Sequence, residues 1–133
     1  MNAAKQPAEI KLVDSELKVM NVIWRLGEPT AKQVAEILQS EIGWNINTTY
    51  TLIKRCIQKG AVQRQEPHFV CRPLVSKESV QAAETSNLIN KIFDGSMEQL
   101  FAALLGRRTV SPEQISQLKR LVEEWPEENS NEN

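Results

Sequence analysis

Apolar residues recur three and four positions apart in the first sixty residues, and this spacing predicts helices with one buried face. The first such stretch begins at Asp14 and ends near Leu26, with the inward positions Leu17, Met20, Ile23 and Trp24. The second opens with the capping box Thr30-Ala31-Lys32-Gln33 and has the inward positions Val34, Ile37 and Leu38. Two short helices followed closely by a third are the layout of a helix-turn-helix domain.

The third stretch, from Trp44 to Gly60, combines a buried side with a polar side that suits a DNA groove. Asn45 can cap this helix and Gly60 can end it. Its apolar stripe consists of Thr49, Leu52, Ile53, Cys56 and Ile57. The polar side and the cap supply the predicted DNA-binding residues Asn45, Asn47, Thr48, Tyr50, Thr51, Lys54 and Arg55. Asn and Thr can reach base edges, and Lys and Arg suit phosphates or guanine. A solvated face on an ordinary packed helix would show the same pattern, but the two preceding helices favour DNA binding.

A short hairpin is predicted directly after the third helix. Residues Ala61–Gln65 and His68–Pro73 have the character of two strands, with Glu66-Pro67 between them. Three helices plus such a wing make a winged helix. We therefore predict a mainly α protein whose residues 1–75 form a winged helix-turn-helix DNA-binding domain.

The second half of the chain predicts three more amphipathic helices. One runs from Ser76 to Gly95, and the capping boxes Ser96-Met97-Glu98-Gln99 and Ser111-Pro112-Glu113-Gln114 start the other two. Three such helices cannot bury their apolar faces well within one chain. We expect residues 76–126 to form a helical dimerisation domain with the core residues Leu100, Phe101, Leu104, Leu118 and Trp125. Packing back on the winged helix is the alternative. The acidic tail, residues 127–133, is expected to be disordered.

The charge distribution fits this division better than the overall charge does. The whole chain of 133 residues has a net charge of −1, which by itself does not favour DNA binding. Residues 1–75 contain ten Lys and Arg against seven Asp and Glu, whereas residues 76–133 contain six against ten. A basic reader joined to an acidic assembly element fits these halves. No apolar run approaches a membrane span and no signal peptide is apparent, so we expect a cytoplasmic protein.

Catalytic and metal sites find little support. The single histidine, His68, lies in the predicted wing without a carboxylate or nucleophile at a telling spacing. Cys71 lies three residues further along the predicted strand, so the two side chains would point to opposite faces. Two such ligands do not make a zinc site. Cys56 belongs to the apolar stripe and is expected in the core. We expect no enzyme activity, no metal and no cofactor.

Several motifs resemble the BlaI/MecI penicillinase repressors and the related CopY-type repressors. They are Glu16-Leu17-Lys18-Val19-Met20-Asn21-Val22-Ile23-Trp24, then Trp44, Thr48, Thr51-Leu52-Ile53-Lys54-Arg55, Lys59-Gly60, Ile89-Asn90-Lys91-Ile92-Phe93-Asp94-Gly95-Ser96 and Leu100. The resemblance covers about residues 10 to 125 with the family's spacing kept. It implies a homodimeric winged-helix repressor that occupies an inverted-repeat operator in double-stranded DNA. The C-terminal Cys-x-Cys motifs of the copper-responsive relatives are absent here, which argues against copper sensing by that mechanism.

The resemblance also implies a route of release from DNA. In penicillinase repressors a membrane sensor-protease signals β-lactam, and the repressor is cut at an Asn–Phe bond in its dimerisation half. The matching position here is Ala103-Leu104. We expect this segment to be helical and shielded in the dimer, and to be opened by a membrane sensor-protease or another inducing protease. A winged-helix module that binds a protein instead of specific DNA is the alternative function.

Overall fold

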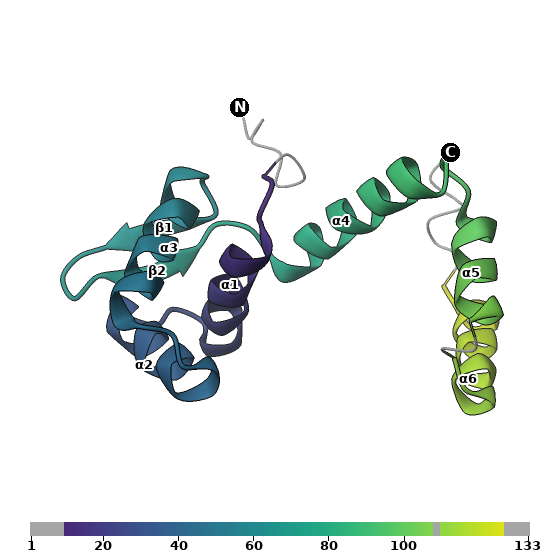
Figure 1. The fold of residues 1–133 in the computed structure, drawn as a ribbon, viewed down its shortest axis with the longest axis horizontal. Coiled ribbons are helices and arrows are strands. Elements are labelled where there is room, and N and C mark those ends of the chain that lie inside the picture. The colour runs from purple at the N-terminus through teal and green to yellow at the C-terminus, as the bar shows by residue number, and fades with distance from the viewer. Residues whose placement is uncertain (1–9, 108–109, 127–133) are drawn as a thin grey trace. The chain divides into compact units, whose positions relative to one another are not determined.

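The computed structural model describes residues 10–107 and 110–126, which form six helices and a two-stranded hairpin (Figure 1). The elements follow in the order α1 (Asp14–Leu26), α2 (Ala31–Ile42), α3 (Ile46–Gln58), β1 (Val62–Gln65), β2 (Val70–Pro73), α4 (Lys77–Ile92), α5 (Met97–Gly106) and α6 (Pro112–Glu123). Three helices with a hairpin wing, followed by further helices, confirm the predicted fold class. The chain divides into two compact units, between Asn87 and Leu88. The predicted tail, residues 127–133, lies outside the described residues.

Local capping groups explain where the helices begin. The Thr30 hydroxyl accepts a hydrogen bond from Gln33 N–H at 3.1 Å, and the Gln33 side chain accepts one from Thr30 N–H at 2.9 Å. Ser111 and Gln114 make the same reciprocal pair at the start of α6. At α1 the expected cap is wrong, because Asp14 is the first helical residue and Val13 is the N-cap. Val13 has no polar side chain with which to cap the helix, but its own N–H donates to the Glu16 carboxylate at 2.9 Å.

The hairpin is shorter than predicted and is attached to the start of α2. Its antiparallel register runs from Val62 opposite Pro73 to Gln65 opposite Val70. The second strand begins two residues later than expected, because His68 and Phe69 adopt left-handed backbone (φ 76° and 53°) and belong to the turn. His68 therefore does not share a strand with Cys71. The Phe69 carbonyl accepts from Ala31 N–H at 2.9 Å.

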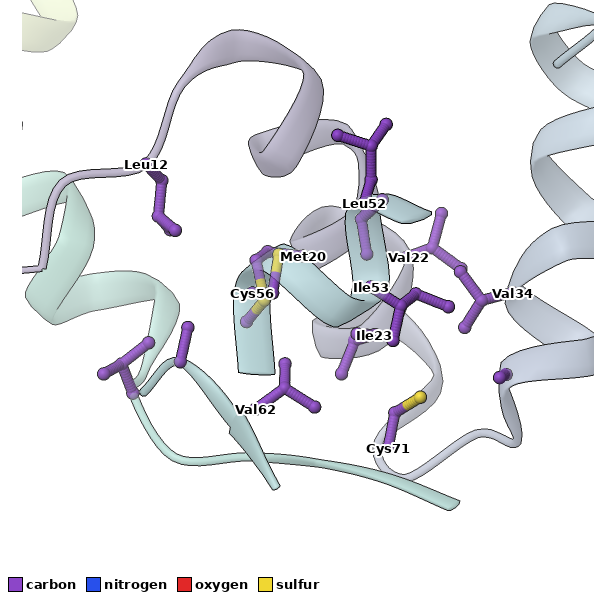
Figure 2. Close-up of a cluster of buried hydrophobic side chains, with 14 of the residues drawn as sticks. Leu12, Met20, Val22, Ile23, Val34, Leu52, Ile53, Cys56, Val62 and Cys71 are labelled. Carbon is purple, nitrogen blue, oxygen red and sulfur yellow. The ribbon is translucent and has the colours of Figure 1, made fainter. Parts of the chain in front are cut away.

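The core of the first unit draws on α1, α2, α3, both strands and the start of α4 (Figure 2). Met20 and Ile23 of α1, Ile53 of α3 and Val62 of β1 are among its fully enclosed side chains. The α3 stripe confirms the predicted inward face, since Thr49, Leu52, Ile53 and Cys56 are buried. Such a core fixes α3 by its inner side and leaves its outer side in solvent.

The junction between the hairpin and α4 is part of the first unit. The Trp24 indole N–H donates to the Val75 carbonyl at 2.9 Å. Val75 and Val80, both 5% exposed, pack in the winged-helix core. The start of α4 at Lys77 lies next to the predicted domain boundary, but the first turns of α4 pack with the winged helix.

The second unit contains α5 and α6, and neither helix has a buried residue in the described part of the chain. Side chains of both helices line two shared apolar grooves. The exposed apolar residues of this unit include Leu105 (51%), Leu121 (52%) and Val122 (74%). The apolar surfaces of α5 and α6 therefore stay open in the described chain.

Candidate nucleic-acid interface

The outer face of α3 carries the predicted DNA-binding residues. Asn47, Thr48, Thr51, Lys54 and Arg55 are all exposed, and the spacing of 3.6 residues per turn places Thr48, Thr51 and Arg55 on neighbouring turns. Thr49 lies between the two exposed threonines in the sequence but on the inner side of α3, where it is fully buried and its hydroxyl has no hydrogen-bond partner among the described residues. Thr48 and Thr51 therefore face solvent, whereas Thr49 faces the core.

Asn45 and Tyr50 are placed differently from the other predicted contacts. The Asn45 amide oxygen accepts from Asn47 N–H at 2.7 Å and so confirms the predicted N-cap. Tyr50 is half-buried, and its ring lies edge-on to Phe69 of the wing turn, with centroids 5.9 Å apart and planes at 80°. Tyr50 therefore joins α3 to the wing.

Arg64 completes this contact from the wing. Its guanidinium carbon lies 3.8 Å from the centroid of the Phe69 ring, and its Nε forms an ion pair with Glu66. Cation–π contact and the carboxylate together hold the Arg64 side chain on one side of Phe69. Neither Arg64 nor Phe69 was assigned to the DNA-binding surface from the sequence. The only sequence signal for them is an aromatic residue and a cation on the two arms of a hairpin beside a polar-faced helix.

The C-terminal end of α3 is anchored by an ion pair with α1. The Lys59 ammonium lies 2.6 Å from the Glu16 carboxylate and 2.7 Å from the Lys11 carbonyl oxygen. Glu16 is 2% exposed. Burial acts to raise the pKa of Glu16, but hydrogen bonds from Lys59 and Val13 N–H, with the charges of Lys59 and Arg55, outweigh it and lower the pKa below its ordinary value. The charge of Lys59 is thus compensated inside the protein, whereas Lys54 forms no ion pair with the described carboxylates.

The two cysteines are core residues. Burial raises the pKa of Cys56 to about 12, with a contribution from the charge of Glu16, and raises the pKa of Cys71 to about 11. Both thiols are free and fully buried. Within residues 10–107 and 110–126, no group of three or more His, Cys, Asp or Glu side chains is placed to hold a metal ion.

The predicted dimer-core residues lie in the second unit. Phe101 is 43% exposed, Leu104 37%, Leu118 39% and Trp125 58%, while Leu100 is half-buried. Ala103 and Leu104, the predicted cleavage position, lie inside α5, so the prediction that this segment is helical is confirmed. No helix of the described chain is long and apolar enough to cross a membrane.

Comparison with known proteins identifies the family. A family model described as penicillinase repressor matches residues 12–124. The chain is 26% identical over 114 residues to the methicillin resistance regulatory protein MecI of Staphylococcus aureus (strain N315), covering 84% of this chain and 93% of that protein. It is 26% identical over 116 residues to the penicillinase repressor of Bacillus licheniformis, covering 86% and 91%. Among solved structures, the DNA-binding domain of the repressor BlaI aligns with 56% of this chain and 90% of that chain, at 30% identity and a TM-score of 0.49. The family model spans most of the chain, and the chain therefore belongs to the penicillinase repressor family.

Proposed function

We propose that the protein is a cytoplasmic, homodimeric transcriptional repressor that blocks a promoter by occupying an inverted repeat in double-stranded DNA. The observation that carries this proposal is the outer face of α3, where Thr48, Thr51 and Lys54 are exposed on a helix whose inner side is fixed in the core. A rigid helix with short polar groups and a cation can enter the major groove. Membership of a family of repressors supports the same conclusion.

Roles within the interface follow from side-chain chemistry and position. Thr48 and Thr51 are assigned to bases or thymine methyl groups, with Asn47 beside them at the N-terminal end of α3. Lys54 and Arg55 are assigned to phosphates. Tyr50 of α3 is a candidate phosphate hydroxyl donor, and Arg64 of β1 a candidate wing contact, because both side chains pack against Phe69 at the junction of α3 and the wing.

Dimerisation is proposed to bury the apolar side of α5 and α6. These helices have no buried residue in the described chain, and Phe101, Leu118 and Trp125 are at least 39% exposed. Open apolar surface of this kind is usual at assembly interfaces. A two-fold partner would also supply the second reading helix that an inverted repeat requires.

Release is proposed to follow a cut near Ala103-Leu104 by a membrane sensor-protease or another inducing protease. A cut inside α5 would separate α6 from the rest of the chain and weaken the dimer. Operator binding would then fall, because the two half-site contacts would no longer be linked. A site for a specific protease, inserted at Ala103-Leu104, tests this. Unchanged operator affinity after complete digestion would assign release to a ligand or partner instead.

The decisive experiment is a mobility-shift titration of the protein on the promoter DNA upstream of its own gene. We expect tighter binding to this DNA than to a scrambled fragment of equal length, and a steep loss of affinity with salt. Thr48→Ala with Thr51→Ala should reduce the discrimination between the two DNAs, since each lost base contact costs about 1–3 kcal/mol.

Thr49→Val is the matched control for these threonine variants. It changes the same residue type in the same helix, but on the buried side, where the hydroxyl has no partner among the described residues. DNA discrimination should stay as in the unmodified protein. Equal binding to promoter and scrambled DNA by the unmodified protein would reject the repressor and favour a winged-helix module that binds a protein.

A further inference from the structure

A hollow in the first unit lies away from the residues assigned to DNA. It is formed by α1, α2 and the first residue of α4, and none of its lining residues comes from α3 or from the hairpin. Its volume is about 550 Å³. This volume falls within the range of about 300–1,000 Å³ that is usual for small-molecule sites. A ligand in this hollow would leave the reading face uncovered.

The floor of the hollow is apolar. Val22 and Leu38, which contribute to the floor, are 2% and 3% exposed. The half-buried indole of Trp24 lines the hollow beside them. Rigid apolar groups at the base suit the hydrocarbon body of a ligand, since burying that body removes apolar surface from water.

The rim of the hollow is cationic. Three cations line it, Lys18, Arg25 and Lys77, against the single carboxylate of Glu41. Arg25 already pairs with Glu41 at 3.3 Å. Lys18 of α1 and Lys77 of α4 form no ion pair with a carboxylate in residues 10–107 and 110–126. Two cations without a carboxylate partner beside an apolar floor match a ligand that carries an anionic group on an apolar body.

We propose that this hollow binds a small organic carboxylate, with its apolar body on Val22, Leu38 and Trp24 and its carboxylate between Lys18 and Lys77. The charged group stays near solvent while the body is enclosed, so the cost of removing an anion from water is small. The site belongs to the first unit alone. Its existence is independent of the proposed DNA-binding function.

Such a ligand would also act on the junction that leads to the second unit. The Trp24 indole N–H holds the Val75 carbonyl at 2.9 Å, and Lys77 is the first residue of α4. Trp24 and Lys77 also line a second hollow with Pro73, Leu74 and Ser76. A ligand that bridges Lys18 and Lys77 would bind best to one direction of α4. Because a ligand shifts a conformational equilibrium towards the state that it binds best, this direction of α4 would become more populated. On the proposed function, the result is a change in the spacing of the two reading helices.

The site is tested by nuclear magnetic resonance on the full-length protein with phenylacetate and hexanoate as probes, at constant ionic strength. We expect saturable shifts of the Trp24 indole signal and of the Val22 and Leu38 amides. Phenylacetamide, which has the same ring without the charge, should bind about fivefold more weakly, which is the upper end of what one exposed charge pair contributes. The double variant Lys18→Gln, Lys77→Gln should weaken phenylacetate binding by about the same factor, because it removes the same charge pairs from the protein side.

Lys32→Gln is the matched control, because Lys32 is an exposed lysine of α2 that does not line the hollow. It should leave the affinity for phenylacetate unchanged. Absence of saturable shifts with both carboxylates, or equal binding of phenylacetamide, would overturn the proposed site. If phenylacetate binds but the affinity for the promoter DNA is unchanged, the site is supported and its regulatory role is overturned. If the ligand-free protein does not bind the promoter DNA, that result counts against the proposed function and not against the site.

Discussion

The two compact units of this chain use similar helices in opposite ways. In the first unit, α1 to α3 and the hairpin enclose side chains such as Ile23, Ile53 and Val62 almost completely. In the second unit, α5 and α6 carry apolar stripes of the same period, yet neither helix has a buried residue among those described. Amphipathic sequence is therefore sufficient to form a helix in both units, but it does not specify where the apolar face is covered. The first unit covers it internally, whereas α5 and α6 leave it exposed.

The largest expected effect comes from separating the two units. A chain that ends after Asn87 keeps Val75 and Val80 in the winged-helix core, so it should fold as a monomer. Its operator affinity should fall by about 10²–10⁴, because the two half-site contacts are no longer linked. Sedimentation and mobility-shift titrations would measure both quantities. A truncated chain that remains a tight dimer would move the proposed interface to the first unit.

A pair of alanine variants should distinguish an internal core from an intermolecular one. Ile53→Ala should lower the free energy of unfolding by about 2–5 kcal/mol at any protein concentration, since it leaves a cavity in an enclosed core. Leu118→Ala should lower the melting temperature by an amount that depends on protein concentration, because dimerisation contributes by mass action. Thermal unfolding at two concentrations tests the pair. If the loss of stability depended on protein concentration in the same way for both variants, the distinction between an internal core and an intermolecular one would be rejected.

The ion pair between Glu16 and Lys59 should give a smaller, pH-dependent effect. The pKa of Glu16 is lowered in the folded chain from an ordinary value of 4.5. Its contribution to stability is therefore complete above that pH and is lost as the pH falls through the folded-state pKa. Lys59→Met should cost about 1–3 kcal/mol at neutral pH, since it leaves the Glu16 carboxylate buried without its partner.

Glu16→Gln separates the charge of this pair from its packing. The variant keeps the size of the side chain but removes the titration, so its unfolding free energy should vary less between pH 5 and pH 3 than that of the unmodified protein. Denaturant unfolding at several pH values measures the difference. Parallel pH profiles for the two proteins would show that Glu16 is not the group responsible.

The smallest effect concerns single phosphate contacts on the reading face. Lys54→Gln should weaken binding to promoter and scrambled DNA alike and reduce the slope of log affinity against log salt by about 0.9. Lys59→Gln should leave that slope unchanged, because Glu16 already compensates the charge of Lys59. Salt titrations of the two variants at matched protein concentration would compare them directly. An equal change of slope would place Lys59 on the DNA as well.

Sequence patterns predicted the features that depend on neighbours along the chain. The inward stripe of α3, its Asn45 cap and the Thr30 capping box follow from helical period and local hydrogen bonds. The pattern could not predict contacts between distant residues, such as Lys59 with Glu16 or Trp24 with Val75.

The wing and α4 show two further limits of the sequence patterns. The left-handed backbone at His68 and Phe69 shortened the predicted strand and turned Phe69 toward Tyr50. In α4 one apolar stripe divides between environments, since Val80 is buried in the winged-helix core and Ile92 is 65% exposed. Tertiary packing decides both outcomes.

The enclosure of Cys56 and Cys71 gives the winged-helix unit an internal reporter of its opening. Both thiols are fully buried, and their pKa values of about 12 and 11 leave little reactive thiolate at neutral pH. A thiol reagent would therefore modify them only during excursions that expose the core, and the labelling rate would follow the free energy of those excursions. The described part of the second unit contains no cysteine. Labelling thus measures the unfolding of the winged-helix unit separately from events in α5 and α6.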